Sequence, residues 1–223
     1  MKNLFVSFSV IALVVAFASC SKPKNNSTAS TTANIKFVNG CAGTSMVSVT
    51  SNGMSVTTNL AFLAATGYQS VTAGSDSVAF ILTSTGTPLK TFTTPLGAKG
   101  YYTAFLGGLV NSSPAFVSID DLSAPSSGNA KIRLVNLSPD ALSITGSAGV
   151  TFASSVASGT ASAFAEVAAG TYVVKAGDPA NINSIVSAAS QSFTSGKIYT
   201  VIYTGTATGT GSSALTATVL SNN

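Results

Sequence analysis

Two stretches of this chain repeat each other, and this repeat constrains the fold more than any other feature. Residues 33–39, ANIKFVN, align with residues 130–136, AKIRLVN, so Ile35 corresponds to Ile132 at a separation of 97 positions (132 − 35). Two further anchors keep the same order and nearly the same separation: residues 71–74 with 167–170, and residues 102–103 with 199–200. A period this long predicts two tandem domains, because solenoid units run about 20–50 residues.

Each copy is predicted to be all-β. In the second copy Ile132 and Leu134 alternate with charged neighbours, Lys131 and Arg133, which is the pattern of a strand with one face inward. Residues 198–203 alternate with both faces largely apolar, which predicts a central strand. Short strands between Gly, Ser and Pro turns are typical of sandwiches. The sequence therefore predicts two tandem antiparallel β-sandwich (Ig-like) domains.

The predicted boundaries follow from the repeat and from composition. Residues 123–129, SAPSSGN, are predicted to be a linker. The first module then covers residues 33–122 and the second covers residues 130–223. Residues 20–32 are rich in Ser, Thr and Asn, and they cannot bury enough apolar surface to fold. They are predicted to be a flexible tether.

The first twenty residues have the parts of an export signal. Lys2 supplies a positive start, and residues 4–17 are apolar apart from two serines. A membrane-spanning helix needs about 20 apolar residues, so the pattern predicts a cleaved signal peptide over residues 1–19. The small residues before Cys20 resemble a lipobox, which predicts that Cys20 is diacylated and anchors the protein to a membrane. The alternative is an ordinary signal peptide that happens to precede a cysteine.

Composition argues against several classes of function. The chain has ten Lys and Arg, six Asp and Glu and no His, with a formal net charge of +4. The basic residues do not cluster, so nucleic acid is not a predicted partner. General acid–base catalysis usually employs His, and ordinary zinc or copper sites use His or several Cys. The sequence therefore predicts no enzyme activity, no catalytic residues, no metal and no other cofactor.

Three local features have both a structural and a functional interpretation. The functional ones are a reactive thiol at Cys41, a ligand-contacting loop at residues 138–140, and a calcium ion shared by Asp120 and Asp121 with loop oxygens. Cys41 stands alone once Cys20 is lipidated, and it is interpreted as a small, partly buried filler. Residues 138–140, Ser-Pro-Asp, are predicted to form a turn, because Pro presets φ and Asp bonds backbone amides. Asp120 and Asp121 are adjacent in a predicted strand, so they are expected to point to opposite faces as solvated charges.

Two further segments have weaker functional readings. Residues 205–211 are predicted to form a mobile hairpin loop, because neither a helix nor a lysine follows to make a phosphate loop. Asp76-Ser77-Val78 fits the three-residue pattern of O-glycan attachment in some Bacteroidota, which makes Ser77 a candidate modification site.

The second copy resembles a known family. Residues 130–141, AKIRLVNLSPDA, are similar to the opening of a bacterial domain-of-unknown-function family found in tandem in secreted and lipid-anchored proteins. Residues 169–172, AGTY, and 196–200, GKIYT, are similar to its central and late strands. The resemblance is partial in the first copy, where Gly40-Cys41-Ala42-Gly43 replaces the Ser-Pro-Asp turn. It implies a sandwich-like fold in the cell envelope, and it implies no activity and no functional residues.

Two functional hypotheses follow. Loops on rigid sandwiches commonly carry binding, so the first is a non-enzymatic cell-envelope lipoprotein that binds glycan or protein. The second is a periplasmic structural or assembly lipoprotein with a protein partner. The expected location is a lipid anchor in the Gram-negative envelope, at the outer membrane. Lys22 and Lys24 lie where some Bacteroidota-type lipoproteins carry acidic surface-export signals, and the sequence is compatible with either face.

Overall fold

A computed structural model describes residues 31–146, 153–178 and 181–223. The predicted signal peptide, Cys20 and nearly all of the predicted tether lie outside these residues. Within the described part of the chain, no helix has the length and apolar character that crossing a membrane requires.

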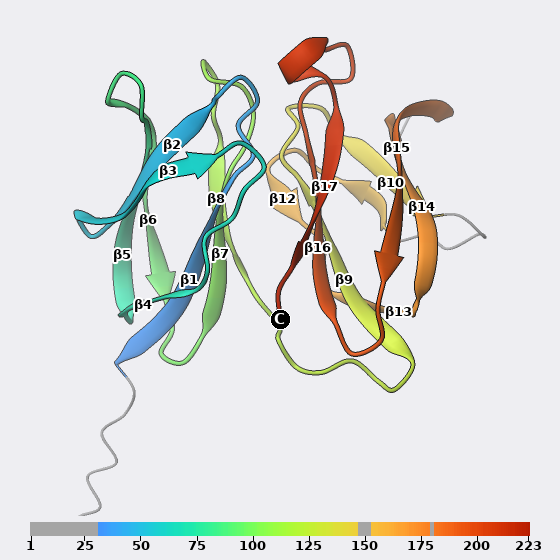
Figure 1. Cartoon of the computed structure of the whole chain (residues 1–223), viewed down its shortest axis with the longest axis horizontal. Coiled ribbons are helices and arrows are strands. Elements are labelled where there is room, and N and C mark those ends of the chain that lie inside the picture. The colour runs from blue at the N-terminus through green and yellow to red at the C-terminus, as the bar shows by residue number, and fades with distance from the viewer. Residues whose placement is uncertain (1–30, 147–152, 179–180) are drawn as a thin grey trace, which may run out of the picture.

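Strands β1 to β8 form two sheets that pack face to face (Figure 1). One sheet has the order β4-β1-β7-β8, and the other has the order β3-β2-β5-β6. The strands are β1 (Thr32–Asn39), β2 (Met46–Ser51), β3 (Met54–Ala61), β4 (Gln69–Thr72), β5 (Gly74–Leu82), β6 (Thr87–Leu96), β7 (Tyr101–Leu106) and β8 (Ala115–Ile119).

Strands β9 to β17 repeat this arrangement. One sheet has the order β12-β9-β16-β17, with β13 also paired to β9, and the other has the order β11-β10-β14-β15. The elements are β9 (Asn129–Asn136), β10 (Leu142–Gly146), β11 (Ala153–Val156), β12 (Thr160–Ala161), β13 (Ala165–Ala168), β14 (Gly170–Asp178), β15 (Asn181–Phe193), β16 (Ile198–Thr204), the 3-10 helix η1 (Gly211–Ser213) and β17 (Thr216–Ser221).

The predicted all-β tandem sandwich is confirmed, with one difference in strand direction. Most pairs are antiparallel, but β1 pairs with β7 in parallel and β9 pairs with β16 in parallel. In each copy the chain leaves the first strand, passes through strands of both sheets and returns beside the first strand in the same direction. Strand β16 lies between β9 and β17 and is buried along its length, as the two apolar faces of residues 198–203 predict.

The copies share local hydrogen bonds as well as topology. The Asn39 Oδ1 accepts from the Cys41 amide at 3.1 Å, and the Asn136 Oδ1 accepts from the Ser138 amide at 2.9 Å. The Tyr102 hydroxyl accepts from the Gly97 amide, as the Tyr199 hydroxyl accepts from the Thr194 amide. These repeated residues therefore have a structural role, because each fixes the backbone at a turn.

Among the described residues, three apolar clusters form the core of the molecule. One cluster lies between the two sheets of the first sandwich, and another lies between the two sheets of the second. The third lies between the sandwiches, where the β4-β1-β7-β8 and β12-β9-β16-β17 sheets face each other (Figure 1). It contains Val38, Phe105, Val135, Leu137 and Ile202. We call this contact between the two modules the seam.

The seam also includes close backbone contacts. The Gly108 amide donates to the Leu137 carbonyl at 2.8 Å, and the Thr204 hydroxyl donates to the Gly40 carbonyl. A Cβ at Gly40 would lie 2.3 Å from Leu137 Cδ1, so a glycine at this position lets Leu137 approach. The two modules therefore pack closely along the seam, where apolar side chains are buried and backbone groups form hydrogen bonds between the modules.

Candidate functional site

A buried ion pair crosses the seam. Arg133 lies on β9, is 1% exposed, and holds its Nη2 2.5 Å from Asp120 Oδ1 of the other module. The same guanidinium donates to the Ser118 hydroxyl at 3.0 Å and the Ile119 carbonyl at 3.1 Å. Its Nε donates to the Thr200 hydroxyl at 3.0 Å. The planar guanidinium therefore fixes the end of β8 against β9 through charge-assisted hydrogen bonds.

The position of Asp120 corrects the sequence-based expectation. Its side chain is fully buried, and its Oδ2 accepts from the Thr103 hydroxyl at 2.6 Å and the Tyr68 hydroxyl at 2.5 Å. The expectation of a solvated charge is wrong because Asp120 follows β8 at the seam, where the second module covers it. Asp121 is solvated as expected, with a side chain 54% exposed that pairs with Lys131 Nζ at 3.0 Å.

The prediction that β9 faces inward on one side only is also wrong. Lys131 and Arg133 are both buried, together with the apolar residues that alternate with them. The reason is that β9 lies in the sheet that contacts the first module. One face of this strand packs on its own sandwich core, and the other packs on the neighbouring sandwich.

Lys36 is a second buried cation at the seam. It lies on β1, is 4% exposed, and donates from Nζ to Asn222 Oδ1 at 2.8 Å. The ammonium also lies 5.0 Å from the centre of the Tyr68 ring. Among the described residues, no carboxylate forms an ion pair with Lys36. Burial lowers the pKa of Lys36 to about 8, an effect that the Asp120 charge opposes and the Arg133 charge reinforces.

Lys36 and Arg133 are equivalent residues of the two modules, 97 positions apart (133 − 36). Asp120 directly follows Ile119, which pairs with Tyr102, and Asn222 directly follows Ser221, which pairs with the equivalent Tyr199. Each cation therefore contacts the residue after the last strand of the other module.

The aromatic partners of these cations are equivalent too. Tyr68 and Phe164 directly precede Gln69 and Ala165, which pair with the equivalent residues of β1 and β9. The Arg133 guanidinium lies 4.7 Å from the Phe164 ring centre, as Lys36 lies over Tyr68. The two halves thus share one arrangement and differ in charge, because the Arg133 half contains a carboxylate and the Lys36 half contains an amide.

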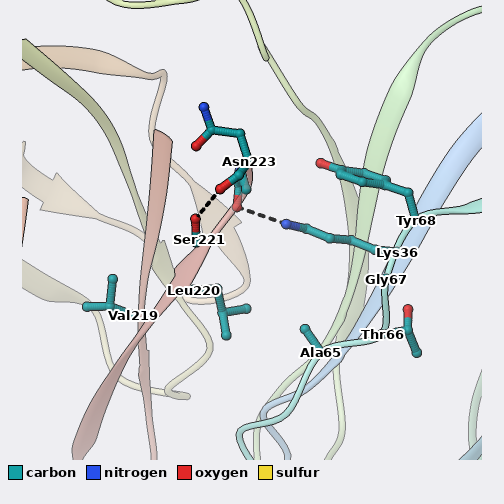
Figure 2. A pocket seen from close by; sticks show the side chains of 10 residues that line it. Lys36, Ala65, Thr66, Gly67, Tyr68, Val219, Leu220, Ser221 and Asn223 are labelled. Atoms are coloured by element: carbon teal, nitrogen blue, oxygen red, sulfur yellow. Dashed lines mark hydrogen bonds between the residues drawn. The ribbon is translucent and has the colours of Figure 1, made fainter. Parts of the chain in front are cut away.

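The Lys36 half opens into a pocket of about 410 Å³ (Figure 2). Figure 2 shows Lys36 reaching across the gap toward β17, with Tyr68 beside it on the same wall. The pocket is lined by Lys36, Ala65, Thr66, Gly67, Tyr68, Val219, Leu220, Ser221, Asn222 and Asn223. Its volume lies in the range of about 300–1,000 Å³ that is typical of small-ligand sites. Both modules contribute to its wall, so it exists only when they are docked.

A second hollow, of about 490 Å³, also has lining residues from both modules. It is lined by Leu89, Lys90, Ser112, Ser113, Pro114, Pro139 and Ser158. Its one lysine is exposed, so it lacks the buried charge that distinguishes the seam pocket.

The other candidate residues have structural surroundings. The Asp140 carboxylate of the predicted turn accepts from the Ala207 amide at 2.9 Å and so holds part of the loop 205–211. Cys41 is buried in the first core, with its Sγ 3.2 Å from the Ser113 hydroxyl. Ser77 is exposed on β5, whereas the preceding Asp76 is buried and accepts from the Ser51 hydroxyl at 2.9 Å.

No ligand-binding residue is predicted from the sequence, so Lys36, Tyr68 and Asn222 emerge only from the structure. A signal for Lys36 existed in the repeat, because equivalent positions of both copies carry a cation inside an otherwise apolar strand. Tyr68 and Asn222 lie outside the matching anchors, so only the three-dimensional docking shows their place. Among the described residues, no group of three His, Cys, Asp or Glu side chains could hold a metal ion.

The fold and the seam define a two-module all-β protein with a cation-walled pocket between the modules. The chain belongs to the family of the domain of unknown function DUF4397, which matches residues 33–146. The matched residues cover all strands of the first module and the first two strands of the second.

Two other comparisons add little. No curated protein matches the chain. Among solved structures, the chain is similar to a family CBM26 module from Eubacterium rectale Amy13K, solved in complex with maltoheptaose. The identity is 12% and the TM-score is 0.25, with 86% of this chain and 97% of that chain covered. At this TM-score the likeness carries no argument about fold or ligand.

Proposed function

We propose that this protein is a non-enzymatic cell-envelope lipoprotein that acts as a binding module for glycan or protein, with its ligand in the seam pocket. The observation that carries the proposal is Lys36, a buried ammonium at the wall of a pocket, with a neutral amide as its hydrogen-bond partner. Burying an unpaired charge is unfavourable for folding. Buried charges without a counter-ion are typical of functional sites, where residues are retained although they reduce the stability of the fold.

The alternative is a periplasmic structural or assembly lipoprotein with a protein partner. A partner-binding face would be expected as a contiguous exposed apolar patch. The most exposed large apolar side chains are Met46, Met54 and Ile119, which belong to three different strands. Single exposed apolar residues are ordinary on protein surfaces, so these residues favour the assembly role less than the pocket favours binding.

The binding function is tested by screening the mature protein against a panel of glycans and envelope proteins. Lys36→Met retains the apolar part of the side chain and removes the charge, and it is expected to lose the ligand that the wild-type protein binds. Lys197→Met is the matched control, because Lys197 is exposed and lies outside the pocket. Hits that bind both variants equally would contradict a ligand site at the seam.

The location is tested on intact cells with trypsin. Lys24 precedes Asn25 in the predicted tether, whereas Pro23 shields Lys22 from cleavage. Release of a fragment that begins at Asn25 would indicate the cell surface. Protection until the outer membrane is permeabilised would indicate the periplasm, where the assembly alternative gains support. Replacing Cys20 with Ser should abolish membrane association if this residue carries the lipid.

A further inference from the structure

Among the described residues, the side chains at the seam carry one more positive charge than negative charge. Three charged side chains meet there: Lys36, Arg133 and Asp120. Asp120 is engaged by Arg133, Thr103 and Tyr68. Lys36 is left with the neutral Asn222 oxygen and the Tyr68 ring. In the equivalent half of the seam, the residue at the position of Asn222 is the carboxylate that neutralises Arg133.

Hydrogen-bond donors are also in excess beside Lys36. Asn222 is 7% exposed and lines the pocket, and its Nδ2 has no partner among the described residues. Its Oδ1 is occupied by Lys36 Nζ and by the Thr200 hydroxyl at 3.2 Å. A buried amide donor without an acceptor is unfavourable. An ammonium and an unpaired amide, which meet in the pocket from its two sides, together favour an anionic oxygen acceptor, and a carboxylate supplies two such oxygens.

The other residues of the pocket wall indicate which class of molecule would carry this carboxylate. Thr66, Ser221 and Asn223 have short polar side chains that exchange hydrogen bonds with hydroxyl groups. The Tyr68 ring is held in place by its bond to Asp120 and by an edge contact with Tyr101 at 5.1 Å between ring centres. Protein-binding hot spots are usually large apolar or aromatic anchors in desolvated centres. The large side chains of this kind on the wall are Tyr68, whose hydroxyl is bonded to Asp120, and Val219 and Leu220, which pack against the apolar clusters. A hydroxyl-rich ligand fits it better than a peptide.

We propose that the seam pocket binds the carboxylate of an acidic sugar unit in a glycan, with Lys36 as the anion contact. This inference rests on the proposed binding function and narrows its ligand to glycans that contain uronate units. Lys36 and Asn222 come from different modules, so the site requires the docked pair and neither module alone would form it.

The test uses the mature protein and isothermal titration with oligogalacturonate as the probe. The matched neutral probe is the same oligosaccharide as its methyl ester, which retains the ring and hydroxyls and removes the charge. We expect the oligogalacturonate to bind at least ten times more tightly than its ester. Lys36→Met should weaken oligogalacturonate binding at least tenfold, and Lys197→Met should leave it unchanged.

Asn222→Asp supplies a second test that does not remove the lysine. The new carboxylate would occupy the position equivalent to Asp120 and would neutralise Lys36 from within the protein. We expect this variant to lose oligogalacturonate binding at least tenfold while its circular dichroism spectrum stays unchanged. Unchanged binding by Asn222→Asp would overturn the proposal.

The remaining outcomes distinguish failure of the acidic-sugar inference from failure of the proposed binding function. Equal binding of the acid and its ester, with loss in Lys36→Met, would overturn the carboxylate inference and retain a glycan-binding function at the seam. Binding of poly-glutamate peptide without oligogalacturonate would overturn the sugar as the carrier of the carboxylate. Failure of oligogalacturonate, its ester, the peptide and the wider panel to bind would overturn the proposed function itself.

Discussion

Arg133 Nη2 lies 2.5 Å from the Asp120 carboxylate, whereas the equivalent Lys36 Nζ lies 2.8 Å from an oxygen of the Asn222 amide. The same backbone position of the repeat thus carries a neutralised cation in one half of the seam and an unneutralised cation in the other. Only the second of these lines the pocket of about 410 Å³. The difference between one carboxylate and one amide therefore separates a structural contact from a candidate binding site.

Asp120→Asn should destabilise the protein strongly. The change retains the shape of the side chain but leaves the Arg133 guanidinium buried without its counter-ion. Breaking a buried pair in this way costs about 3–5 kcal/mol, measured as the free energy of unfolding in urea. Asp121→Asn is the control, because its exposed pair with Lys131 should be worth less than about 1 kcal/mol. Equal losses in the two variants would contradict the assignment.

Lys36→Met should stabilise the protein near pH 7. The Lys36 pKa falls from 10.5 in the unfolded chain to about 8 in the folded protein. That difference corresponds to an upper limit of about 3 kcal/mol, since each pKa unit is about 1.4 kcal/mol. Thermal unfolding at pH 7 measures the gain, with Lys197→Met as control. A marked loss of stability in Lys36→Met would show that Lys36 has a structural role.

Wild-type stability should also rise with pH between about 8 and 9. In this window the unfolded chain holds the Lys36 proton and the folded protein releases it, so deprotonation favours the folded state. Above about pH 9 ionisation of the Cys41 thiol in the unfolded chain should offset this rise. Above about pH 10 the trend should reverse, because burial raises the pKa of Cys41, Tyr68 and Tyr203 and keeps them protonated only when folded. Urea unfolding at a series of pH values measures both effects. Lys36→Met should lack the rise.

Binding of an anionic ligand should weaken as pH rises through about 8. Lys36 loses its charge there, while Asp120 stays engaged with Arg133 and Tyr68 stays protonated. The association constant for oligogalacturonate should therefore be flat between pH 6 and 7 and then fall by about tenfold for each further pH unit once Lys36 is mostly neutral. A bound anion raises the Lys36 pKa in the complex, so the fall begins near the pKa of the free protein and levels off only above the pKa of the complex. An affinity that stays flat to pH 10 would contradict Lys36 as the anion contact.

Phe105→Ala should uncouple the two modules. Phe105 is fully buried in the seam, stacked on Phe116 at 5.2 Å between ring centres and 5.4 Å from the Arg133 guanidinium. Truncating a buried Phe costs about 3–5 kcal/mol. We expect calorimetry to show one transition in the wild-type protein and two in the variant. A single transition with an unchanged midpoint would show that the seam contributes little to stability.

The sequence predicts the elements well because each copy carries strong strand periodicity. Residues 198–203, for example, are apolar on both faces, and they form the buried central strand β16. Each anchor occurs in both copies and can be compared between them. Tyr102 and Tyr199 are therefore equivalent by sequence, and their hydrogen bonds match in the structure. Local patterns and internal comparison together account for the two sandwiches.

The site could not be predicted in the same way. Alternation within one strand assigns a charged residue to solvent, and this fails for Lys36 and Arg133 because the covering surface comes from the other copy. Asn222 has no local feature that marks it as a lysine partner 186 positions away. Docking geometry decides these contacts, and one sequence with no aligned relatives contains little information about it.

The strand order of the first module affects how the molecule would carry a mechanical load. Strand β1 is the first strand of the chain, and it is held on one side by β4 and on the other by β7 (Figure 1). Tension applied ahead of β1 and resisted at the seam runs along this strand, so its hydrogen bonds to both neighbours are sheared together. Bonds sheared together share the force, whereas bonds peeled from one end break in turn. The strand that carries Lys36 is therefore well placed to transmit a pull between the N-terminal segment and whatever occupies the pocket.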